Sequence, residues 1–452
     1  MTALIESALA RGLDTRVVVM GIDVLSRTGP VFADLFPGER AVIVADGNTW
    51  QAASEQVILS LAARGIEMDE AVVYPASPTL FADDRIVANL CSRLSPTSAV
   101  PVSLASGSLN DVTKLASSRL GRSYINVCTA ASADGYTSFG ASITVNGIKV
   151  TQQCPAPRGV IVPLDVMARA PARLTASGYG DLIEKIPAGA DWIVADELGL
   201  DPIDDYVWGL VQGPLRDALG QPTRLVAGDP DAMARLAEEL IMSGLAMQVF
   251  SSSRPASGAG HYFSHQWEME GYGTTWEPPL SHGFKVGLGT VAMSALYDQV
   301  LTLDLSKIDI DSRLATWPTR DQDEHRVRAL QPNPAICEAA VLQSRAKLLS
   351  KDEARTRLSL IQNRWSAIRT RVAAQVLPAR VVEQMLRDVG AIHHPSQIGV
   401  SLADLRTAYY RAQTIRTRYT VLDLLADVGQ LNQVVDSLFL PGGYWHNRGE
   451  TV

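Results

Sequence analysis

The first third of the chain alternates short apolar runs with stretches of helical spacing. Four of these runs are short enough to be buried strands, at residues 41–45, 71–74, 99–104 and 124–128. Three helices are predicted between them, at residues 48–64, 83–93 and 110–120. Strands that alternate with helices pair in parallel through right-handed crossovers, so the pattern predicts an α/β domain.

A β-hairpin is predicted next, where Asn146 and Gly147 separate two apolar segments at residues 139–145 and 148–152. Asn-Gly between alternating apolar residues is the strongest short hairpin signal. One more short strand is expected at residues 160–162, and strand signals then become scarce.

From about Val166 onward the pattern is helical. The clearest predicted helices are at residues 181–192, 232–243, 338–349, 351–375, 379–388, 402–412 and 421–431. The change of pattern places a boundary near Asp165. We therefore expect an α/β domain over residues 1–165 and an all-α domain over residues 166–452.

Composition and charge narrow the class of partner. The chain has 452 residues, of which 46% are hydrophobic and 19% charged, as expected of a soluble globular protein. Its net charge of −8 argues against a nucleic-acid partner, because phosphate backbones require basic patches. A small phosphorylated substrate needs only a few local cations and remains compatible with this charge.

The four cysteines, Cys91, Cys128, Cys154 and Cys337, form no C-x-x-C pair and no dense framework. Reduced thiols and a cytoplasmic location are therefore expected. The first 14 residues carry charges without a long apolar core, unlike a signal peptide. No run approaches the roughly 20 apolar residues of a membrane span, so none is predicted.

Three strand ends suggest a dinucleotide site. Asp46 follows a predicted strand and is suited to accept hydrogen bonds from ribose hydroxyls, although it is also suited to cap the next helix. The small residues 105–108 (ASGS) would let backbone amides approach a pyrophosphate, or form an ordinary tight turn. Residues 129–132 (TAAS) follow the fourth strand. Together the three strand ends favour nucleotide binding at one sheet edge.

Histidine is scarce, with seven in the chain, yet three cluster in one region. His261 and His265 lie four residues apart, a spacing that places both on one face of a helix. His282 follows shortly afterwards. Neutral imidazole is the commonest nitrogen ligand of divalent transition metals, so a metal site and a structural His pair are both open.

Two acids are candidates to join the histidines. Asp181 follows Gly178-Tyr179-Gly180 and is predicted to open a helix, where an acid is also favoured by the helix dipole alone. Asp134 precedes Gly135, and Asp-Gly is first of all a turn signal. Spacing by itself does not bring Asp181 to the histidines.

Several segments resemble a known family. Residues 103–151 (SLASGSLNDVTKLASSRLGRSYINVCTAASADGYTSFGASITVNGIKVT) resemble the sn-glycerol-1-phosphate dehydrogenases, particularly the bacterial arabinose-operon-associated branch. The resemblance continues through LTASGYGDLIEK, SRPASGAGHYFSHQWEM, SHGFKVGLGT and GVSLADLRTAYYRAQTIRTRYTVLDLLADVG. That family belongs to the superfamily of dehydroquinate synthases, glycerol dehydrogenases and iron-type alcohol dehydrogenases. Nearly the whole chain is covered, with the motifs in order.

The resemblance implies a dehydroquinate synthase-like fold: a Rossmann-like NAD(P)-binding domain, a helical domain, and the cofactor between them. It implies that Asp181, His261 and His282 bind one divalent metal ion, which is zinc, nickel or iron. It further implies that His265, Asp134 and Asp181 contact the substrate and act in catalysis. The implied cofactor contacts are Asp46, Ala105, Ser106, Gly107, Ser108, Leu109, Thr129, Ala130, Ala131, Ser132 and Ser138.

The chain also departs from the family pattern. The family usually has Gly where this chain has Ala105, and Glu where this chain has Gly260. It commonly has TAPSMD where residues 129–134 read TAASAD. These differences leave the implied metal ligands intact and affect the surroundings of substrate and metal.

The activity implied is interconversion of dihydroxyacetone phosphate and sn-glycerol 1-phosphate with NAD(P)H, aided by a metal acting as a Lewis acid. NAD is the expected cofactor, since Asp46 would repel a 2′-phosphate, with NADP also possible. Lys285 and Arg254 are the candidates to meet the phosphate. A homodimer or larger homo-oligomer is expected. The alternatives are a dehydrogenase of glycerol or another polyol, a dehydroquinate synthase-like cyclase, and a non-enzymatic nucleotide-binding relative.

Overall fold

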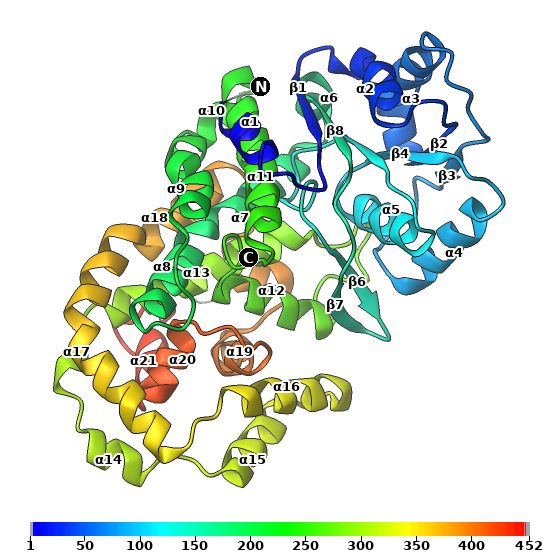
Figure 1. Cartoon of the computed structure of the whole chain (residues 1–452). Helices are drawn as coiled ribbons and strands as arrows, with labels where there is room; N and C mark the ends of the chain where they lie inside the picture. The colour runs from blue at the N-terminus through cyan, green and yellow to red at the C-terminus, as the bar shows by residue number, and fades with distance from the viewer. Residues whose placement is uncertain (1–2, 447, 449–452) are drawn as a thin grey trace.

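The computed structural model describes residues 3–446 and 448, and its first part is built on a parallel sheet (Figure 1). The six strands lie in the order β1 (Val17–Gly21), β8 (Gly159–Pro163), β5 (Ile125–Cys128), β4 (Val100–Ala105), β2 (Ala41–Asp46) and β3 (Val72–Tyr74). Every neighbouring pair is parallel. The predicted strands are thus confirmed, while β1, at the sheet edge, was not predicted.

Helices cover both faces of the sheet. On one face α2 (Thr28–Leu35) and α3 (Gly47–Ala62) pack over β2 and β4 in one apolar cluster. On the other face α4 (Asp84–Leu94) and α5 (Gly107–Arg119) form a second cluster. The chain runs from β2 to β3 in one direction and continues through β4 and β5 in the other, so the strand order reverses between β2 and β4. Ligands of open α/β sheets bind at such a reversal.

The predicted hairpin is confirmed. Strands β6 (Ala141–Val145) and β7 (Ile148–Gln152) pair antiparallel. Asn146 and Gly147 both have positive φ, 51° and 80°, as a type I′ turn requires. The hairpin extends towards α12 (Ala259–Met269), and Lys149 on β7 forms an ion pair with Glu268 on α12 at 3.0 Å.

The remainder is helical, shown from green to red in Figure 1. Its larger elements are α7 (Ala172–Ile183), α8 (Lys185–Glu197), α9 (Asp205–Leu219), α11 (Pro230–Phe250), α13 (His282–Val300), α15 (Arg320–Leu330), α16 (Pro334–Lys347), α17 (Lys351–Gln375), α18 (Ala379–Asp388), α19 (Leu402–Thr414) and α21 (Leu431–Phe439). The short ones are α1 (Ala3–Leu9), η1 (Val24–Arg27), α6 (Leu164–Arg169), α10 (Pro222–Val226), η2 (Leu305–Lys307), α14 (Ile310–Ala315), η3 (Pro395–Ile398) and α20 (Val421–Asp427).

One predicted helix boundary is wrong. Asp181 does not open a helix: it lies in the last turn of α7, and α8 begins at Lys185. Gly178 and Gly180 lie inside α7, at positions where the backbone of other segments passes too close for a side chain. A Cβ on Gly180 would lie 2.5 Å from the carbonyl oxygen of Gly283 on α13. These glycines therefore allow close packing instead of breaking a helix.

A second predicted helix is divided. The pattern at residues 421–431 predicts one helix, but the chain forms α20 and α21, separated at Gly429, which has φ of 74°. Glycine adopts this left-handed conformation without a steric penalty and commonly ends helices.

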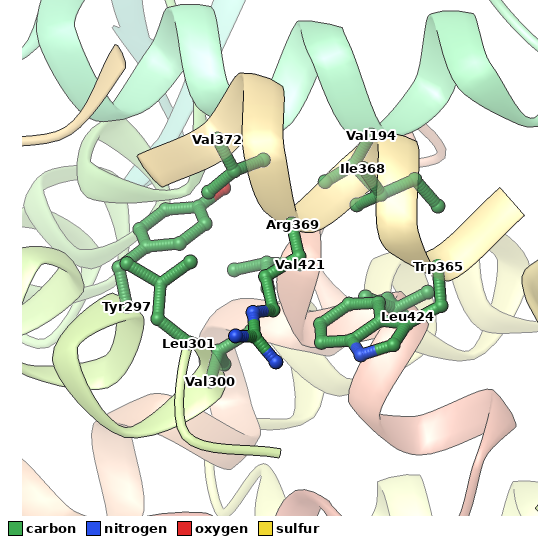
Figure 2. Close-up of a pocket in the computed structure, with 10 residues that line it drawn as sticks. All are labelled: Val194, Tyr297, Val300, Leu301, Trp365, Ile368, Arg369, Val372, Val421 and Leu424. Atoms are coloured by element: carbon green, nitrogen blue, oxygen red, sulfur yellow. The ribbon is translucent and has the colours of Figure 1, made fainter. Parts of the chain in front are cut away.

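The helical core is closely packed. Figure 2 shows apolar side chains of α8, α13, α17 and α20 around a small hollow, with Val194, Tyr297, Trp365 and Leu424 among them. None of the residues predicted to bind metal or nucleotide lines this hollow. Within the described residues, no helix is both long and apolar enough to cross a membrane. The division at residue 165 stays a prediction, since one apolar cluster includes Val160 and Val162 of β8 together with the helices.

Candidate metal and nucleotide site

Three helices bring the predicted metal ligands together. Asp181 comes from the end of α7, His261 from the first turn of α12 and His282 from the first residue of α13. One ligand atom from each residue can be chosen so that all three lie within 4.8 Å of one another. His261 Nε2 lies 3.3 Å from Asp181 Oδ1, and the Asp181 side chain is fully buried. The geometry joins residues that spacing alone could not connect.

Each imidazole is held through its Nδ1 atom. His261 Nδ1 lies 2.8 Å from Glu184 Oε2, and His282 Nδ1 lies 3.2 Å from the hydroxyl of Ser264. Hydrogen bonds at Nδ1 leave Nε2 of both rings available to a cation, which is how metal-binding histidines are usually oriented.

Asp134 is tied directly to Asp181. The Asp134 backbone amide donates to Asp181 Oδ2 at 3.0 Å. The Asp134 carboxylate oxygen Oδ2 lies 2.7 Å from the ammonium of Lys185. The same ammonium lies 3.4 Å from Asp181 Oδ1. Ser243 donates a hydrogen bond to the same Asp134 oxygen at 2.9 Å. The predicted substrate residue therefore lies beside the candidate metal ligands.

Sequence reasoning missed Lys185, Glu184 and Ser243. Lys185 follows Asp181 by four residues, a spacing that could have indicated a helical ion pair. Glu184 and Ser243 carry no local signal, because each reaches its partner across a contact between separate helices.

The nucleotide candidates lie at neighbouring strand ends. Strand register aligns Ala45 with Leu104, and Ala105 with Cys128. Asp46 at the end of β2, Ser106 after β4 and Thr129 after β5 therefore share the carboxyl edge of the sheet. A Cβ on Gly107 would meet only Ala133, at 3.9 Å, so the first turn of α5 is sterically open.

Several of these positions also have structural roles. Asp46 Oδ1 accepts hydrogen bonds from the amides of Asn48 and Thr49, so the alternative reading as a helix cap is confirmed. Leu109 is buried in the apolar cluster under α5, which leaves only its backbone for a ligand. The hydroxyls of Ser132 and Ser138 hydrogen-bond within their own loop, to Tyr136 and Gly135.

Comparison with known proteins decides the family. Residues 19–171 match the family model described as "Iron-containing alcohol dehydrogenase". The glycerol-1-phosphate dehydrogenase [NAD(P)+] of Methanothermobacter thermautotrophicus is 32% identical over 62% of this chain and 78% of that protein. The corresponding protein of Geobacillus stearothermophilus is 30% identical over 65% of this chain and 73% of its own length. The chain belongs to the glycerol-1-phosphate dehydrogenase family.

Similarity to other members of this family is partial in length. The match to the glycerol-1-phosphate dehydrogenase [NAD(P)+] of Halalkalibacterium halodurans has 36% identity and covers 56% of this chain and 64% of that protein, less than two thirds. The fold is shared more widely. A probable glycerol dehydrogenase from Sinorhizobium meliloti superposes with a TM-score of 0.59 at 14% identity, covering 94% of this chain and 98% of its own.

In this glycerol-1-phosphate dehydrogenase family member, one carboxylate and two imidazoles fit a divalent transition metal. Three protein ligands leave further coordination positions open, as in catalytic sites. The charges agree with this chemistry. Burial raises the pKa of Asp181, but Lys185 and the hydrogen bond from His261 outweigh it and hold that pKa below its usual range.

The two imidazoles differ in basicity. Burial lowers the pKa of His261, but Glu184 and the hydrogen bonds to Asp181 and Glu184 outweigh this effect and raise the pKa to about 9. Burial lowers the pKa of His282 to about 4. The metal-free site therefore retains a proton on His261, at the place where a cation would bind.

His265 lies on the same helix face as His261, as predicted. Its ring centre is 5.7 Å from that of His282 and 6.4 Å from that of His261. Its Nδ1 atom is buried without a hydrogen-bond partner among the described residues. Burial holds the pKa of His265 well below its usual value, so the ring is neutral and able to form a hydrogen bond to a substrate hydroxyl.

The two cations proposed for the phosphate have different surroundings. Arg254 is committed to the fold: its guanidinium donates to the carbonyl oxygens of Asp191 and Tyr419 and pairs with Asp201. Lys285 is buried, and its ammonium lies 3.9 Å from Glu268. Lys149 reaches the same carboxylate from the hairpin and lines a pocket of about 210 Å³.

Proposed function

We propose that this protein is a metal-dependent, NAD(P)-linked dehydrogenase that interconverts dihydroxyacetone phosphate and sn-glycerol 1-phosphate. The observation that carries the proposal is the convergence of Asp181, His261 and His282 within 4.8 Å. Relatives with 30–36% identity to this chain are named glycerol-1-phosphate dehydrogenase [NAD(P)+]. We also propose the arabinose-operon-associated branch, a cytoplasmic location and a homo-oligomeric state.

A metal bound by these three residues would supply a Lewis acid, and a bound nicotinamide would supply the hydride donor or acceptor. The protein's own residues would do the rest. Asp134, fixed by Lys185 and Ser243, would accept a hydrogen bond from a substrate hydroxyl. His265, buried and neutral, with Nδ1 unpartnered among the described residues, would orient the substrate by a hydrogen bond.

Lys285 and Lys149 are the proposed contacts of the substrate phosphate. Both ammonium groups meet at Glu268, one helical turn after His265. The local charge is then positive by one, which favours an anionic group beside the metal. Arg254 is not proposed for this role, because its guanidinium is buried, donates to two backbone carbonyls and forms an ion pair with Asp201.

The nucleotide is proposed to bind where the strand order reverses, between β2 and β4. The open first turn of α5 would present amides of residues 107–109 to the pyrophosphate. Asp46 Oδ2 is not used in the helix cap and would accept a ribose hydroxyl. The proposed contacts also include residues 129–132 and Ser138. NAD is therefore the proposed preference over NADP.

The test combines elemental analysis with oxidation of NADH in the presence of dihydroxyacetone phosphate. Native protein is expected to hold a divalent metal and to turn over this substrate. His282→Ala is expected to lose metal and activity together. His325→Ala, at an exposed position, is the matched control and should retain both. A His282→Ala protein with normal metal content and turnover would contradict the proposal.

A second candidate substrate is unphosphorylated glycerol. The observation that favours it is the fold shared with probable glycerol dehydrogenase from Sinorhizobium meliloti. The lysine pair at Glu268 favours the phosphorylated substrate instead. Comparing kcat/KM for glycerol with NAD and for glycerol 1-phosphate with NAD separates the two. Higher efficiency with glycerol would overturn the phosphate assignment.

A further inference from the structure

Glu184 joins α7 to α8 and lies entirely inside the protein. Both of its oxygens are used at the start of α12. Oε2 lies 2.8 Å from His261 Nδ1, and Oε1 accepts the backbone amide of Gly258 at 3.1 Å. The carboxylate therefore holds both the ring of a candidate metal ligand and the backbone that leads into its helix.

The room for Glu184 depends on the residue before His261. That residue is Gly260, and a Cβ there would lie 2.7 Å from Glu184 Cγ and 3.0 Å from Glu184 Oε1. A side chain at position 260 and the observed position of Glu184 are thus mutually exclusive. The resemblance described above associates position 260 with glutamate, so this chain lacks a carboxylate there and has one arriving from another helix.

We propose that Glu184 is a positioning residue for metal binding, acting through His261 in place of a carboxylate at position 260. With a metal bound, Glu184 would accept the Nδ1 proton of the neutral ring, leaving Nε2 free for the cation on the side where Asp181 Oδ1 lies 3.3 Å away. A carboxylate behind a metal-bound imidazole fixes the ring's tautomer and raises its basicity. This inference rests on the metal site of the proposed function.

The other imidazole shows the contrast. His282 Nδ1 is held by the neutral hydroxyl of Ser264 at 3.2 Å. Hydrogen bonds with a charged partner are shorter and roughly twice as strong as neutral ones. Of the two residues that hold the imidazoles, Glu184 is the carboxylate and Ser264 the hydroxyl. Removal of Glu184 should therefore weaken metal binding more than removal of Ser264.

The first experiment measures the affinity for Zn²⁺ by chelator competition, together with the absorption spectrum of the Co²⁺-loaded protein. Glu184→Ala is expected to weaken Zn²⁺ binding about 10- to 100-fold and to change the Co²⁺ spectrum. Glu184→Gln, which keeps the volume and one acceptor, should fall between Glu184→Ala and the native protein. Circular dichroism of each metal-free variant checks that it is folded.

Glu239→Gln is the matched control. Glu239 is also a buried glutamate, but neither of its oxygens has a hydrogen-bond partner among the described residues. The Zn²⁺ affinity of the Glu239→Gln protein should equal that of the native protein. If Glu184→Gln and Glu184→Ala both bind Zn²⁺ with native affinity while His261→Ala does not, the inference fails and the proposed function stands. If His261→Ala also retains native affinity, the metal site itself is wrong.

Moving the carboxylate from position 184 to position 260 provides the sharper test. Gly260→Glu alone should weaken Zn²⁺ binding, because its side chain meets Glu184. The double variant Glu184→Ala with Gly260→Glu should recover affinity to within a few-fold of the native protein, since a carboxylate is again available beside His261. A double variant that binds Zn²⁺ no better than Glu184→Ala would overturn the equivalence of the two positions.

Discussion

At the scale of single residues, charge balance organises the site. The Asp134 and Asp181 carboxylates both lie within 3.4 Å of Lys185 Nζ, and Lys185 is fully buried. Burial lowers the pKa of Lys185, but Asp134, Asp181 and Glu184 outweigh it and hold the pKa above its usual value. The ammonium therefore stays charged, and without it two neighbouring carboxylates would repel each other in the interior.

Lys185→Met tests this role. The substitution leaves Asp134 without its cation, so its carboxylate should turn away from the proposed substrate position. Misplacement by about 1 Å can reduce rates by a factor of about 100, and a fall of this size in kcat/KM for dihydroxyacetone phosphate is expected. Steady-state kinetics provide the measurement, with exposed Lys351→Met as control. Native kcat/KM in Lys185→Met would show that Asp134 needs no such support.

Asp46→Ser separates two roles of one side chain. Serine caps helices about as well as aspartate, so the bonds to Asn48 and Thr49 should be replaced and the melting temperature preserved. The negative charge is removed, so the preference for NADH over NADPH should fall. The ratio of kcat/KM for the two cofactors measures this preference. An unchanged ratio would count against contact between Asp46 and the ribose.

At the scale of elements, the strands and helices between residues 41 and 163 were predicted well, because each shows its own periodicity over a short segment, whereas β1 and α2 before them were not predicted. The sequence pattern did not predict where α7 begins or that Asp181 lies in its last turn. Gly178 and Gly180 look like residues that precede a helix, and only their contacts with residues distant in sequence show otherwise. For the site, spacing indicated His261 and His265, whereas Glu184 and Ser243 depend on how separate helices pack.

The α7–α13 contact leads to a prediction for Gly283. A Cβ at Gly283 would lie 1.9 Å from the carbonyl oxygen of Ser177, so Gly283→Ala must displace the first turn of α13, which carries His282. Loss of about 1–3 kcal/mol of unfolding free energy and weaker Zn²⁺ binding are expected. Gly213→Ala, on an open face of α9, is the control and should stabilise by up to about 1 kcal/mol. Chemical denaturation and chelator competition measure both effects.

At the scale of the whole molecule, the candidate metal site joins α7 to the consecutive helices α12 and α13, which are distant from it in sequence. A cation bound there would act as a crosslink present only in the folded protein, because the unfolded chain separates its ligands. Binding to the native state alone stabilises a protein in proportion to the logarithm of ligand concentration. The metal should therefore contribute to stability as well as to the proposed chemistry.

Metal removal should consequently lower the melting temperature. At a free Zn²⁺ concentration 100 times the dissociation constant, the expected stabilisation is about 2.7 kcal/mol. Thermal unfolding of protein treated with a chelator, before and after Zn²⁺ is restored, measures the difference. His282→Ala should show no such response. An equal shift on adding Zn²⁺ to His282→Ala would indicate binding elsewhere.

The hydrogen bond between the Asp134 amide and Asp181 has a thermodynamic consequence. Asp134 belongs to the same loop as residues 129–132, so a ligand that moves one end of that loop would also move the amide bonded to Asp181. Coupling between two binding equilibria is reciprocal. If Zn²⁺ tightens the binding of NADH by some factor, NADH must tighten the binding of Zn²⁺ by the same factor, and the protein's loading with one ligand would then follow the cell's supply of the other.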